Sequence, residues 1–344
     1  MRVLIIGGTR LVGYALTWRL LAAGARVTLL NRGMTPDPFG DRVERIVADR
    51  TTPDFAEVLT GRTFDAAVDF VAYVADDAHH AIAALGRGRG HVGHYIFIST
   101  GQVYLVREGC SKPPQAPLKE TDYAGPVMAR PESSSERSQW DYGVGKRQCE
   151  DALVEAYKTR RFPATRIRIP MVNGERDNER RLESYLTRIL DGGPILLPDG
   201  GKNAVRHAYA GEVARAIAGM LGQERTFGEA YNLSQRESPS LAELLQMAAE
   251  MMGAKTRFVP APAKSITDYG LSLTRVSPFS GRWMSMLDPS LAEAELGFQH
   301  EPLDRYLGKI IASYLAFPPP SPPEGYAQRR DEIALAKNLE NAAR

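Results

Sequence analysis

The first half of the chain alternates short, nearly continuous apolar runs with longer amphipathic stretches. Continuous apolar runs are typical of parallel strands that are covered on both faces. Strands joined by helical crossovers predict an α/β fold, here a Rossmann-like doubly wound parallel sheet whose ligand crevice lies beyond the carboxyl ends of the strands. The first crossover helix is expected over Leu11–Ala23, ending at Gly24. The expected strands are Val3–Ile6, Val27–Leu30, Arg45–Ala48, Ala66–Val71, Tyr95–Ser99 and Ala164–Ile169.

The second half of the chain predicts a smaller mixed α/β substrate-binding cap. Residues 107–138 are polar and rich in proline and serine, so we expect a long loop there. The chain is accordingly divided into a Rossmann domain at 1–170, a cap at 171–316 with some segments interleaved with the sheet domain, and a proline-rich linker with a helical arm at 317–344. Beyond residue 170 we expect helices at Gly211–Leu221, Ser240–Met252, Asp288–Leu296 and Gly325–Asn341, and short strands near 204–209 and 229–233.

Composition narrows the class of protein. The chain has 344 residues, of which 43% are hydrophobic and 24% charged, as in an ordinary globular protein. A formal net charge of +2 gives no basis for a nucleic-acid or membrane partner. No apolar run reaches the roughly 18 residues of a membrane span, and the first run breaks at Gly7, too early for a signal peptide. Cys110 and Cys149 have neither metal nor redox spacing, so we expect a cytoplasmic protein.

The histidines do not predict a metal site. His79 and His80 lie in or near an expected helix, and His91 and His94 come just before a strand. Neither pair has Cys, Asp or Glu partners at the spacing that metal coordination requires.

A glycine-rich turn follows the first expected strand and opens a helix. Glycine lets the backbone turn tightly and approach a pyrophosphate, and the helix N-terminus offers free N–H donors to the anion. This context predicts a dinucleotide site. Its residues are Gly7, Thr9, Arg10, Leu11, Val12 and Gly13.

The end of the second expected strand bears on which dinucleotide binds. A carboxylate there would accept hydrogen bonds from the adenosine ribose of NAD, whereas this chain has Asn31 and Arg32. A donor and a fixed positive charge suit a 2′-phosphate, and Arg10 adds a second charge. The sequence therefore favours NADP, with NAD as the alternative. Asp49, after the third strand, is a candidate acceptor for the adenine amino group.

Tyr142 and Lys146 are the candidate catalytic pair. A spacing of four residues places both side chains on one face of a helix. A nearby ammonium favours the phenolate, so the tyrosine can exchange a proton with a carbinol while the cofactor moves hydride. A hydroxyl at the end of the preceding strand would orient the reacting oxygen, and by chemistry alone Ser99 and Thr100 both qualify.

The motifs together resemble the extended short-chain dehydrogenase/reductase family, which includes the nucleotide-sugar epimerases and dehydratases. The resemblance covers about residues 1–300 and is carried by Gly7-Gly-Thr-Arg-Leu-Val-Gly13, Ser99-Thr-Gly-Gln-Val-Tyr104, Tyr142-Gly-Val-Gly-Lys146 and Arg168-Ile-Pro-Met-Val-Asn-Gly174.

The resemblance implies roles for individual residues. It assigns the catalytic hydroxyl to Thr100 and places Arg206 on the diphosphate of the substrate, for which arginine is the suitable residue type. Thr100, Gln102 and Arg206 are the candidate substrate-binding residues. The nicotinamide end of the cofactor would be lined by Phe70, Val71, Ala72 and Ile98 and closed by Pro170 and Val172.

The chain departs from the family pattern in three ways. Arg10 stands where the middle glycine is usual, which makes the chain an atypical member. Gly101 and Gln102 stand where the 4,6-dehydratases have an acid pair, and because neither can shuttle a proton we do not expect sugar dehydration. Met171 stands where epimerases often have an asparagine that touches the substrate.

The leading interpretation is an NAD(P)-dependent enzyme acting on a carbinol or carbonyl of a nucleotide-sugar-like substrate, most simply an epimerase with transient hydride transfer. An NADPH-dependent ketoreductase on a non-sugar metabolite is the first alternative. A non-catalytic dinucleotide sensor or RNA-binding relative is the second, although such proteins usually lose the tyrosine or the lysine. The resemblance also suggests a homodimer through two long helices, one beginning near Gln139.

Overall fold

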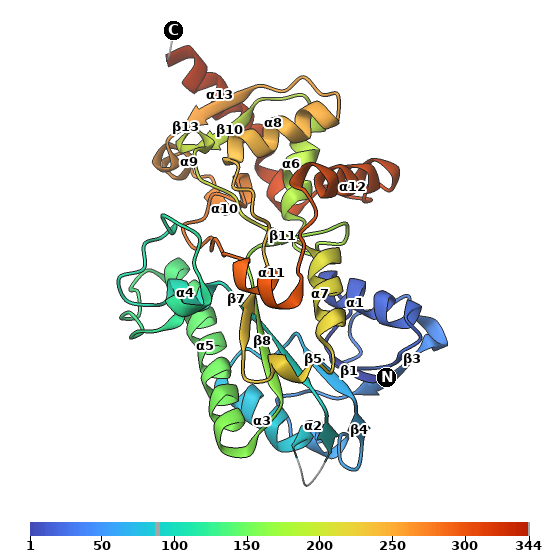
Figure 1. The fold of residues 1–344 in the computed structure, drawn as a ribbon. Coiled ribbons are helices and arrows are strands. Elements are labelled where there is room, and N and C mark those ends of the chain that lie inside the picture. Colours follow the sequence, from blue (N-terminus) through green and yellow to red (C-terminus); the bar gives the residue numbers. More distant parts are fainter. Residues whose placement is uncertain (87–89, 343–344) are drawn as a thin grey trace. The chain divides into compact units, whose positions relative to one another are not determined.

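The chain folds into two compact units, each assembled from three segments. The computed structural model, drawn in Figure 1, describes residues 1–86 and 90–342. The first unit comprises Met1–Val172, Ala208–Ser234 and Ser285–His300. The second comprises Asn173–His207, Gln235–Met284 and Glu301–Arg344. The chain thus leaves the first unit and returns to it twice.

The first unit is built on a seven-stranded, fully parallel sheet in the order β12-β8-β7-β5-β1-β2-β3. The predicted fold class is confirmed. The order reverses between β1 and β5, which is where such sheets open a crevice at their carboxyl edge. The strands are β1 (Arg2–Ile6), β2 (Arg26–Asn31), β3 (Val43–Val47), β5 (Ala66–Asp69), β7 (Tyr95–Thr100), β8 (Ala164–Ile169) and β12 (Ala230–Asn232).

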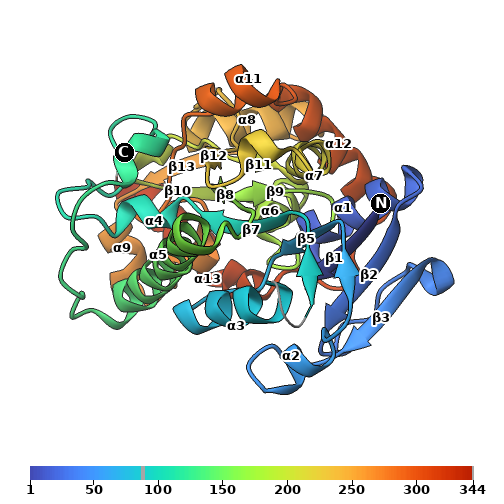
Figure 2. The same cartoon turned by 60° about the horizontal axis from the view of Figure 1, so that its bottom comes forward.

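Helices cover both faces of this sheet, which explains why its strands are apolar throughout. Successive side chains of a strand point to opposite faces. Val3 and Ile5 accordingly pack in one core with α1 and α7, and Leu4 and Ile6 in another with α3 and α5. Figure 2 shows these helix pairs on opposite sides of the sheet. The helices of the unit are α1 (Leu11–Ala22), α2 (Asp54–Glu57), α3 (Ala75–Leu85), α4 (Gln102–Leu105), α5 (Ser134–Arg160), α7 (Ala210–Met220) and α11 (Ser290–Leu296).

The second unit packs helices around a short parallel pair of strands, β10 (Ile195–Pro198) and β13 (Phe258–Ala261). The described residues also form two pairs of two-residue strands: β4 (Thr63–Phe64) with β6 (His91–Val92), and β9 (Val172–Asn173) with β11 (Ala208–Tyr209). The helices of the second unit are α6 (Arg181–Leu190), α8 (Leu241–Met251), α9 (Ala263–Asp268), α10 (Leu273–Val276), α12 (Leu303–Ala316) and α13 (Arg329–Ala342).

The structure corrects three expectations. The long loop ends earlier than expected, because α5 begins at Ser134 rather than near Gln139. The predicted strand near 204–209 shrinks to β11. The final helix is not a separate arm, because its residues Leu335 and Ala336 are buried in a core with Leu196 and Val259 of the second unit.

Candidate active site

The glycine turn after β1 shapes the start of α1. Gly7 and Gly8 have φ angles of +92° and +81°, a region that favours glycine. A Cβ on Gly13 would lie 2.4 Å from Gly8 Cα, so only glycine lets the helix pack so closely on the turn. Arg10 is the exposed N-cap residue of α1, flanked by Thr9 and the first helical residue Leu11, and Val12 is buried. This cradle, which a Cβ would fill, fits the pyrophosphate of a dinucleotide.

Asn31 and Arg32 lie at the carboxyl end of β2, as expected. The Asn31 side-chain oxygen accepts a hydrogen bond from the Gly33 N–H at 2.8 Å, and Arg32 is exposed. Asp49 follows β3, and its carboxylate accepts hydrogen bonds from the backbone and hydroxyl of Thr51. These bonds, together with the positive charge of Arg32, lower the pKa of Asp49. The region therefore offers fixed cationic and acceptor groups beside each other.

Phe70, Val71 and Ala72 follow β5 directly and lie against the glycine turn. A Cβ on Gly7 would be 3.0 Å from Val71 Cγ1 and 3.3 Å from Phe70 Cβ. Ile98 lies in β7, the strand next to β5. β1, β5 and β7 thus bring the glycine turn, expected at the pyrophosphate, close to the residues that the resemblance assigns to the nicotinamide end of the cofactor.

A buried ionic cluster fixes the segment after β5. This cluster was not predicted from the sequence. The Arg50 guanidinium bonds both carboxylate oxygens of Asp69, at 2.8 and 2.7 Å, and Asp77 at 3.1 Å. Asp69 also accepts the Val71 N–H, at 2.9 Å. Asp69 ends β5, Asp77 lies in the first turn of α3 and Arg50 lies in the turn after β3, but nothing in a single sequence links the three.

Tyr142 and Lys146 lie one turn apart on α5, and the two glycines between them let this helix approach its neighbours. A Cβ on Gly143 would be 2.6 Å from Val106 Cγ1, and one on Gly145 would be 2.3 Å from the Tyr73 carbonyl oxygen. The two glycines of the Tyr-Gly-Val-Gly-Lys motif therefore have a packing role. Tyr142 is 38% exposed, whereas Lys146 is buried.

The Lys146 ammonium lies against β7, near the carboxyl end of that strand. Its Nζ donates a hydrogen bond to the Ile98 carbonyl oxygen at 2.8 Å. Burial lowers the pKa of Lys146 to about 8.

The structure separates the two candidate hydroxyls. Ser99 Oγ donates to the buried carboxylate of Glu150 at 2.5 Å, and the same carboxylate binds the Arg168 guanidinium at 2.6 Å. Ser99 is therefore committed to a structural ion-pair network. Thr100 ends β7, and its side-chain hydroxyl accepts a hydrogen bond from the Gln102 N–H at 3.3 Å. Thr100 is therefore the better candidate for the hydroxyl that orients the reacting oxygen of the substrate.

Close packing explains why position 101 is a glycine, and it bears on the expectation that the chain does not dehydrate sugars. A Cβ at this position would lie 2.2 Å from Ser285 Oγ. An acidic side chain therefore does not fit where the dehydratases carry one. Gln102, the first residue of α4, donates its amide to the Gln139 side chain at 2.6 Å.

The remaining predicted residues divide between the two units. Pro170 and Val172 follow β8 in the first unit and are buried. Arg206 belongs to the second unit, where its guanidinium donates to Ser238 Oγ at 2.8 Å and to the Arg236 carbonyl. The first unit thus assembles the predicted cofactor and catalytic residues without it.

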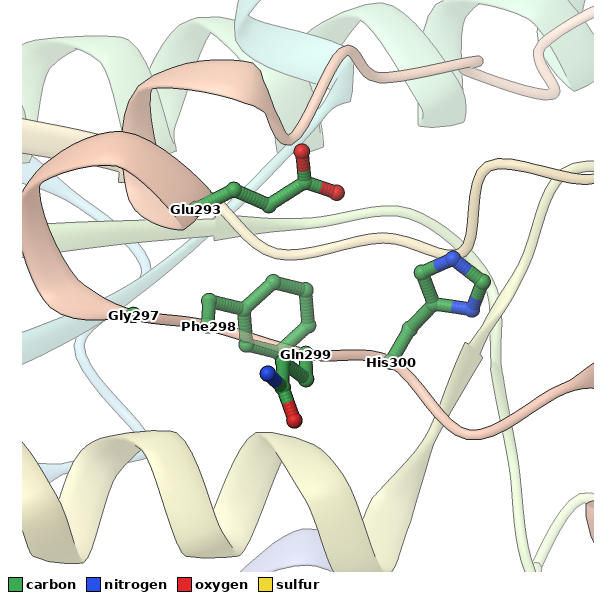
Figure 3. A pocket seen from close by; sticks show the side chains of 5 residues that line it. All are labelled: Glu293, Gly297, Phe298, Gln299 and His300. Carbon is green, nitrogen blue, oxygen red and sulfur yellow. The ribbon is translucent and has the colours of Figure 1, made fainter.

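A separate cavity of about 510 Å³ lies in the first unit, formed by α11 and the segment after it. Figure 3 shows its lining residues Glu293, Gly297, Phe298, Gln299 and His300, none of which was a predicted site residue. α11 contacts the edge strand β12, whereas the catalytic candidates lie on β7 and α5.

Within 1–86 and 90–342, no three His, Cys, Asp or Glu side chains lie where they could hold a metal ion. Over the same residues, no helix combines the length and apolar character needed to cross a membrane.

Comparison with characterised proteins gives distant relatives with different roles. The chain is 24% identical over 266 residues to the chloroplast stem-loop binding protein of 41 kDa b from Arabidopsis thaliana, covering 73% of this chain and 63% of that protein. It is 23% identical over 298 residues to the 2′-dehydrokanamycin reductase of Streptomyces kanamyceticus, covering 85% and 78%. The chain thus spans less than two thirds of the Arabidopsis protein.

Solved structures share the fold. UDP-glucose 4-epimerase from Thermotoga maritima, determined with UDP-glucose, superposes with a TM-score of 0.70 at 17% identity, covering 92% of this chain and 99% of that one. UDP-glucuronic acid 4-epimerase from Bacillus cereus, in complex with UDP-glucuronic acid and NAD, gives 0.69 at 16% identity with the same coverage.

The family model that matches the chain is the one described as the NAD dependent epimerase/dehydratase family, and it matches residues 3–234. That span contains the glycine turn, the strand that ends in Thr100 and the Tyr142–Lys146 pair. The chain therefore belongs to the NAD-dependent epimerase/dehydratase family.

Proposed function

We propose that the chain catalyses NAD(P)-dependent oxidoreduction at a carbinol or carbonyl carbon of a nucleotide-sugar-like substrate, in an epimerase-type reaction. The observation that carries the proposal is that Lys146, one turn from Tyr142 on α5, donates from Nζ to the Ile98 carbonyl oxygen of β7, the strand that ends in Thr100. Because β1, β5 and β7 are parallel, the end of β7 lies at the same edge of the sheet as the glycine turn after β1. The bound nicotinamide would accept hydride from the substrate carbon and return it.

The residues of this chain have separate tasks in that reaction. Tyr142 takes the proton of the substrate hydroxyl and later gives it back, as general base and then acid. The Lys146 charge favours the phenolate form of Tyr142 and holds the nicotinamide ribose. Thr100 hydrogen-bonds the reacting oxygen and orients it for Tyr142. Gln102 and Arg206 are proposed to bind the substrate, with Arg206 on its diphosphate.

Substitution of Tyr142 tests the acid–base role. Tyr142→Phe is expected to reduce turnover at least about a thousandfold, within the range of general acid–base catalysis, because the ring stays but the exchangeable proton is lost. Turnover is measured with a panel of UDP- and dTDP-sugars, and cofactor affinity by fluorescence titration with NADH and NADPH.

Tyr157→Phe is the matched control, since Tyr157 lies on the same helix, four turns further on. It should leave turnover unchanged. Turnover of Tyr142→Phe within tenfold of the parent would remove Tyr142 from the acid–base role.

An NADPH-dependent ketoreductase is the second candidate. Exposed Arg10 and Arg32 at the dinucleotide site favour a 2′-phosphate, and the similarity to 2′-dehydrokanamycin reductase covers 85% of this chain. The cofactor released by denaturing the freshly purified protein separates the candidates. Retained NAD or NADH favours an epimerase that recycles its hydride, whereas an empty site that binds NADPH favours a reductase. A protein that binds a stem-loop RNA and no dinucleotide would favour the RNA-binding alternative.

Substitution of Arg32 tests the preference for NADP. Arg32→Ala is expected to weaken NADP binding about tenfold or more and NAD binding little, because a charge-assisted hydrogen bond to phosphate contributes about 1.5–3 kcal/mol. Dissociation constants for both cofactors are measured by titration, with Arg19→Ala, an exposed α1 substitution, as the control. Equal losses for NADP and NAD would show that Arg32 does not contact a 2′-phosphate.

A further inference from the structure

The Lys146 ammonium lies between two aromatic rings. Its Nζ is 4.8 Å from the centroid of the Tyr73 ring and 4.8 Å from that of the Phe97 ring. Phe97 is fully buried in β7, but Tyr73 is 48% exposed. Tyr73 follows the segment 70–72 assigned to the nicotinamide end of the cofactor, and no role has been given to it above.

Tyr73 is fixed in place by its backbone. Its N–H donates to Asp77 Oδ2 at 2.7 Å, and Asp77 is in turn bound by the buried Arg50 guanidinium. Its carbonyl oxygen is the atom against which Gly145 of α5 packs. The residue therefore has a defined position relative to the helix that carries the catalytic pair.

The Tyr73 ring also contacts the other member of that pair. The centroids of the Tyr73 and Tyr142 rings are 6.3 Å apart, with their planes at 46°. Separations of 4.5–7 Å are typical of interacting aromatic pairs. One side chain thus touches the ammonium of Lys146 and the phenol of Tyr142.

The titratable groups around Lys146 determine how much of its charge the two aromatic rings stabilise. Asp69, Asp77, Arg50 and Cys149 are the titratable groups that influence it, from β5, α3, the segment after β3 and α5 itself. Both carboxylates are paired with Arg50, and burial raises the pKa of Cys149 to about 12, so its thiol is neutral. The hydrogen bond to Ile98 and the two ring faces thus supply much of the direct stabilisation of the charge.

We propose that Tyr73 is a positioning residue of the reaction centre, whose ring holds the Lys146 ammonium charged and in place beside Tyr142. It acts through Lys146 and not as a second acid or base, since burial raises the pKa of its own phenol. Because Tyr73 is partly exposed, its ring can be substituted without disturbing the core, whereas Phe97 is a core residue. The relevance to catalysis rests on the proposed function, but the effect on Lys146 does not.

The charge of Lys146 is measured directly by NMR. Protein labelled with [13C]lysine is titrated from pH 6 to 11, the Cε signal of Lys146 being assigned by its loss in Lys146→Arg. Tyr73→Leu should lower the observed pKa of Lys146 by about one unit, as expected from the loss of a desolvated cation–π contact. Tyr73→Phe keeps the ring and should stay within about 0.3 unit of the parent.

Control variants separate this effect from general destabilisation. Tyr269→Leu removes a comparably exposed ring in the second unit and should leave the Lys146 signal unchanged. Tyr73→Met replaces Tyr73→Leu if the latter does not fold. An unchanged pKa of Lys146 in a folded variant without the ring, or an equal drop in Tyr73→Phe, would overturn the proposal.

Turnover distinguishes failure of this inference from failure of the proposed function. With an active sugar nucleotide, the rise of kcat/KM with pH in the oxidative direction should move to higher pH in Tyr73→Leu, because a neutral Lys146 no longer favours the Tyr142 phenolate. A shifted Lys146 signal together with an active Tyr142→Phe variant would retain the role of Tyr73 toward Lys146 and reject the proposed catalytic pair.

Discussion

At the scale of the residue, Lys146 is an ionisable side chain in a buried environment, which destabilises its charged form. Its side chain is buried, and burial lowers its pKa from the ordinary value near 10.5 to about 8. The unfolded chain therefore binds more protons than the folded one between pH 8 and 10.5. Stability from this group rises with pH across that window, and the full penalty is present below pH 8. We infer that Lys146 is kept for its charge and not for stability.

Replacement of Lys146 by methionine should expose this cost. At pH 7, Lys146→Met removes a desolvation penalty on the order of 3 kcal/mol. It also removes the hydrogen bond to Ile98, worth about 1 kcal/mol, and the cation–π contacts with Tyr73 and Phe97, worth about 1 kcal/mol, so a net gain of about 1 kcal/mol is expected. Urea unfolding at pH 7 and pH 10 is the measurement, and the gain should shrink at pH 10. A variant less stable than the parent at both pH values would contradict this account. Turnover should be lost in either case.

At the scale of the element, α5 combines chemistry with close packing. Gly143 and Gly145 lower its intrinsic helix propensity but allow approach to Val106 on one side and Tyr73 on the other. Glu150, two turns from Gly143, ties the helix to β7 through Ser99 and to β8 through Arg168. Burial alone would raise the pKa of Glu150, but the charge and hydrogen bonds of Arg168 lower it. α5 is thereby fixed against the strand that carries Thr100.

An alanine substitution in α5 tests whether close packing outweighs propensity. Gly145→Ala places a Cβ 2.3 Å from a backbone oxygen, so we expect a loss of about 2 kcal/mol in unfolding free energy, typical of overpacking. Gly308→Ala in α12 meets nothing within 4 Å and should gain about 0.5–1 kcal/mol, as helix propensity requires. Denaturant midpoints of both variants are compared with the parent. Stabilisation by both substitutions would show that α5 has room to move.

At the scale of the whole chain, the final helix belongs to the core of its unit. Arg188 of α6 forms a buried bidentate ion pair with Glu332 of α13, at 2.8 and 2.6 Å. Arg329 of the same helix binds Asp191, at 2.6 Å. The proline-rich stretch before α13 is thus a connection within the unit, and the two contacts explain why residues 317–344 do not form an independent arm.

Breaking this ion pair should destabilise the second unit strongly. Glu332→Gln leaves the buried Arg188 charge with neutral hydrogen-bond partners only, and the expected loss is about 3 kcal/mol or more. Thermal unfolding is followed by circular dichroism, with Glu324→Gln, in the exposed pair with Arg275, as the control expected to change little. Equal midpoints for the two variants would mean that α13 does not contribute to the core.

The homodimer stays a prediction, and the surface of α5 constrains it. Its outward positions include Gln148, Asp151, Glu155 and Lys158, all exposed. An interface formed by this helix would therefore be polar, unlike the apolar centre of most obligate dimers.

The sequence by itself determined the elements whose signals are local. Buried parallel strands are apolar on both faces, so the sequence predicted the sheet. A glycine turn that opens a helix and a Tyr–Lys spacing of four are also local signals, so the turn and the shared helix face of Tyr142 and Lys146 were predicted as well. The strands β10 and β13 were not predicted, because four residues carry too little periodicity, whereas β12 lies within the strand expected near 229–233.

Only the tertiary structure decided which residues distant in the chain contact one another and act together. Ser99 and Thr100 are chemically alike, and only the position of Glu150 on a packed helix commits one of them to structure. Arg50 reaches Asp69 and Asp77, and Tyr73 reaches Lys146, across separate strands and helices. Such pairings depend on the three-dimensional approach of buried groups, whose charges must be neutralised wherever the fold brings them together, and no spacing along the chain encodes that approach.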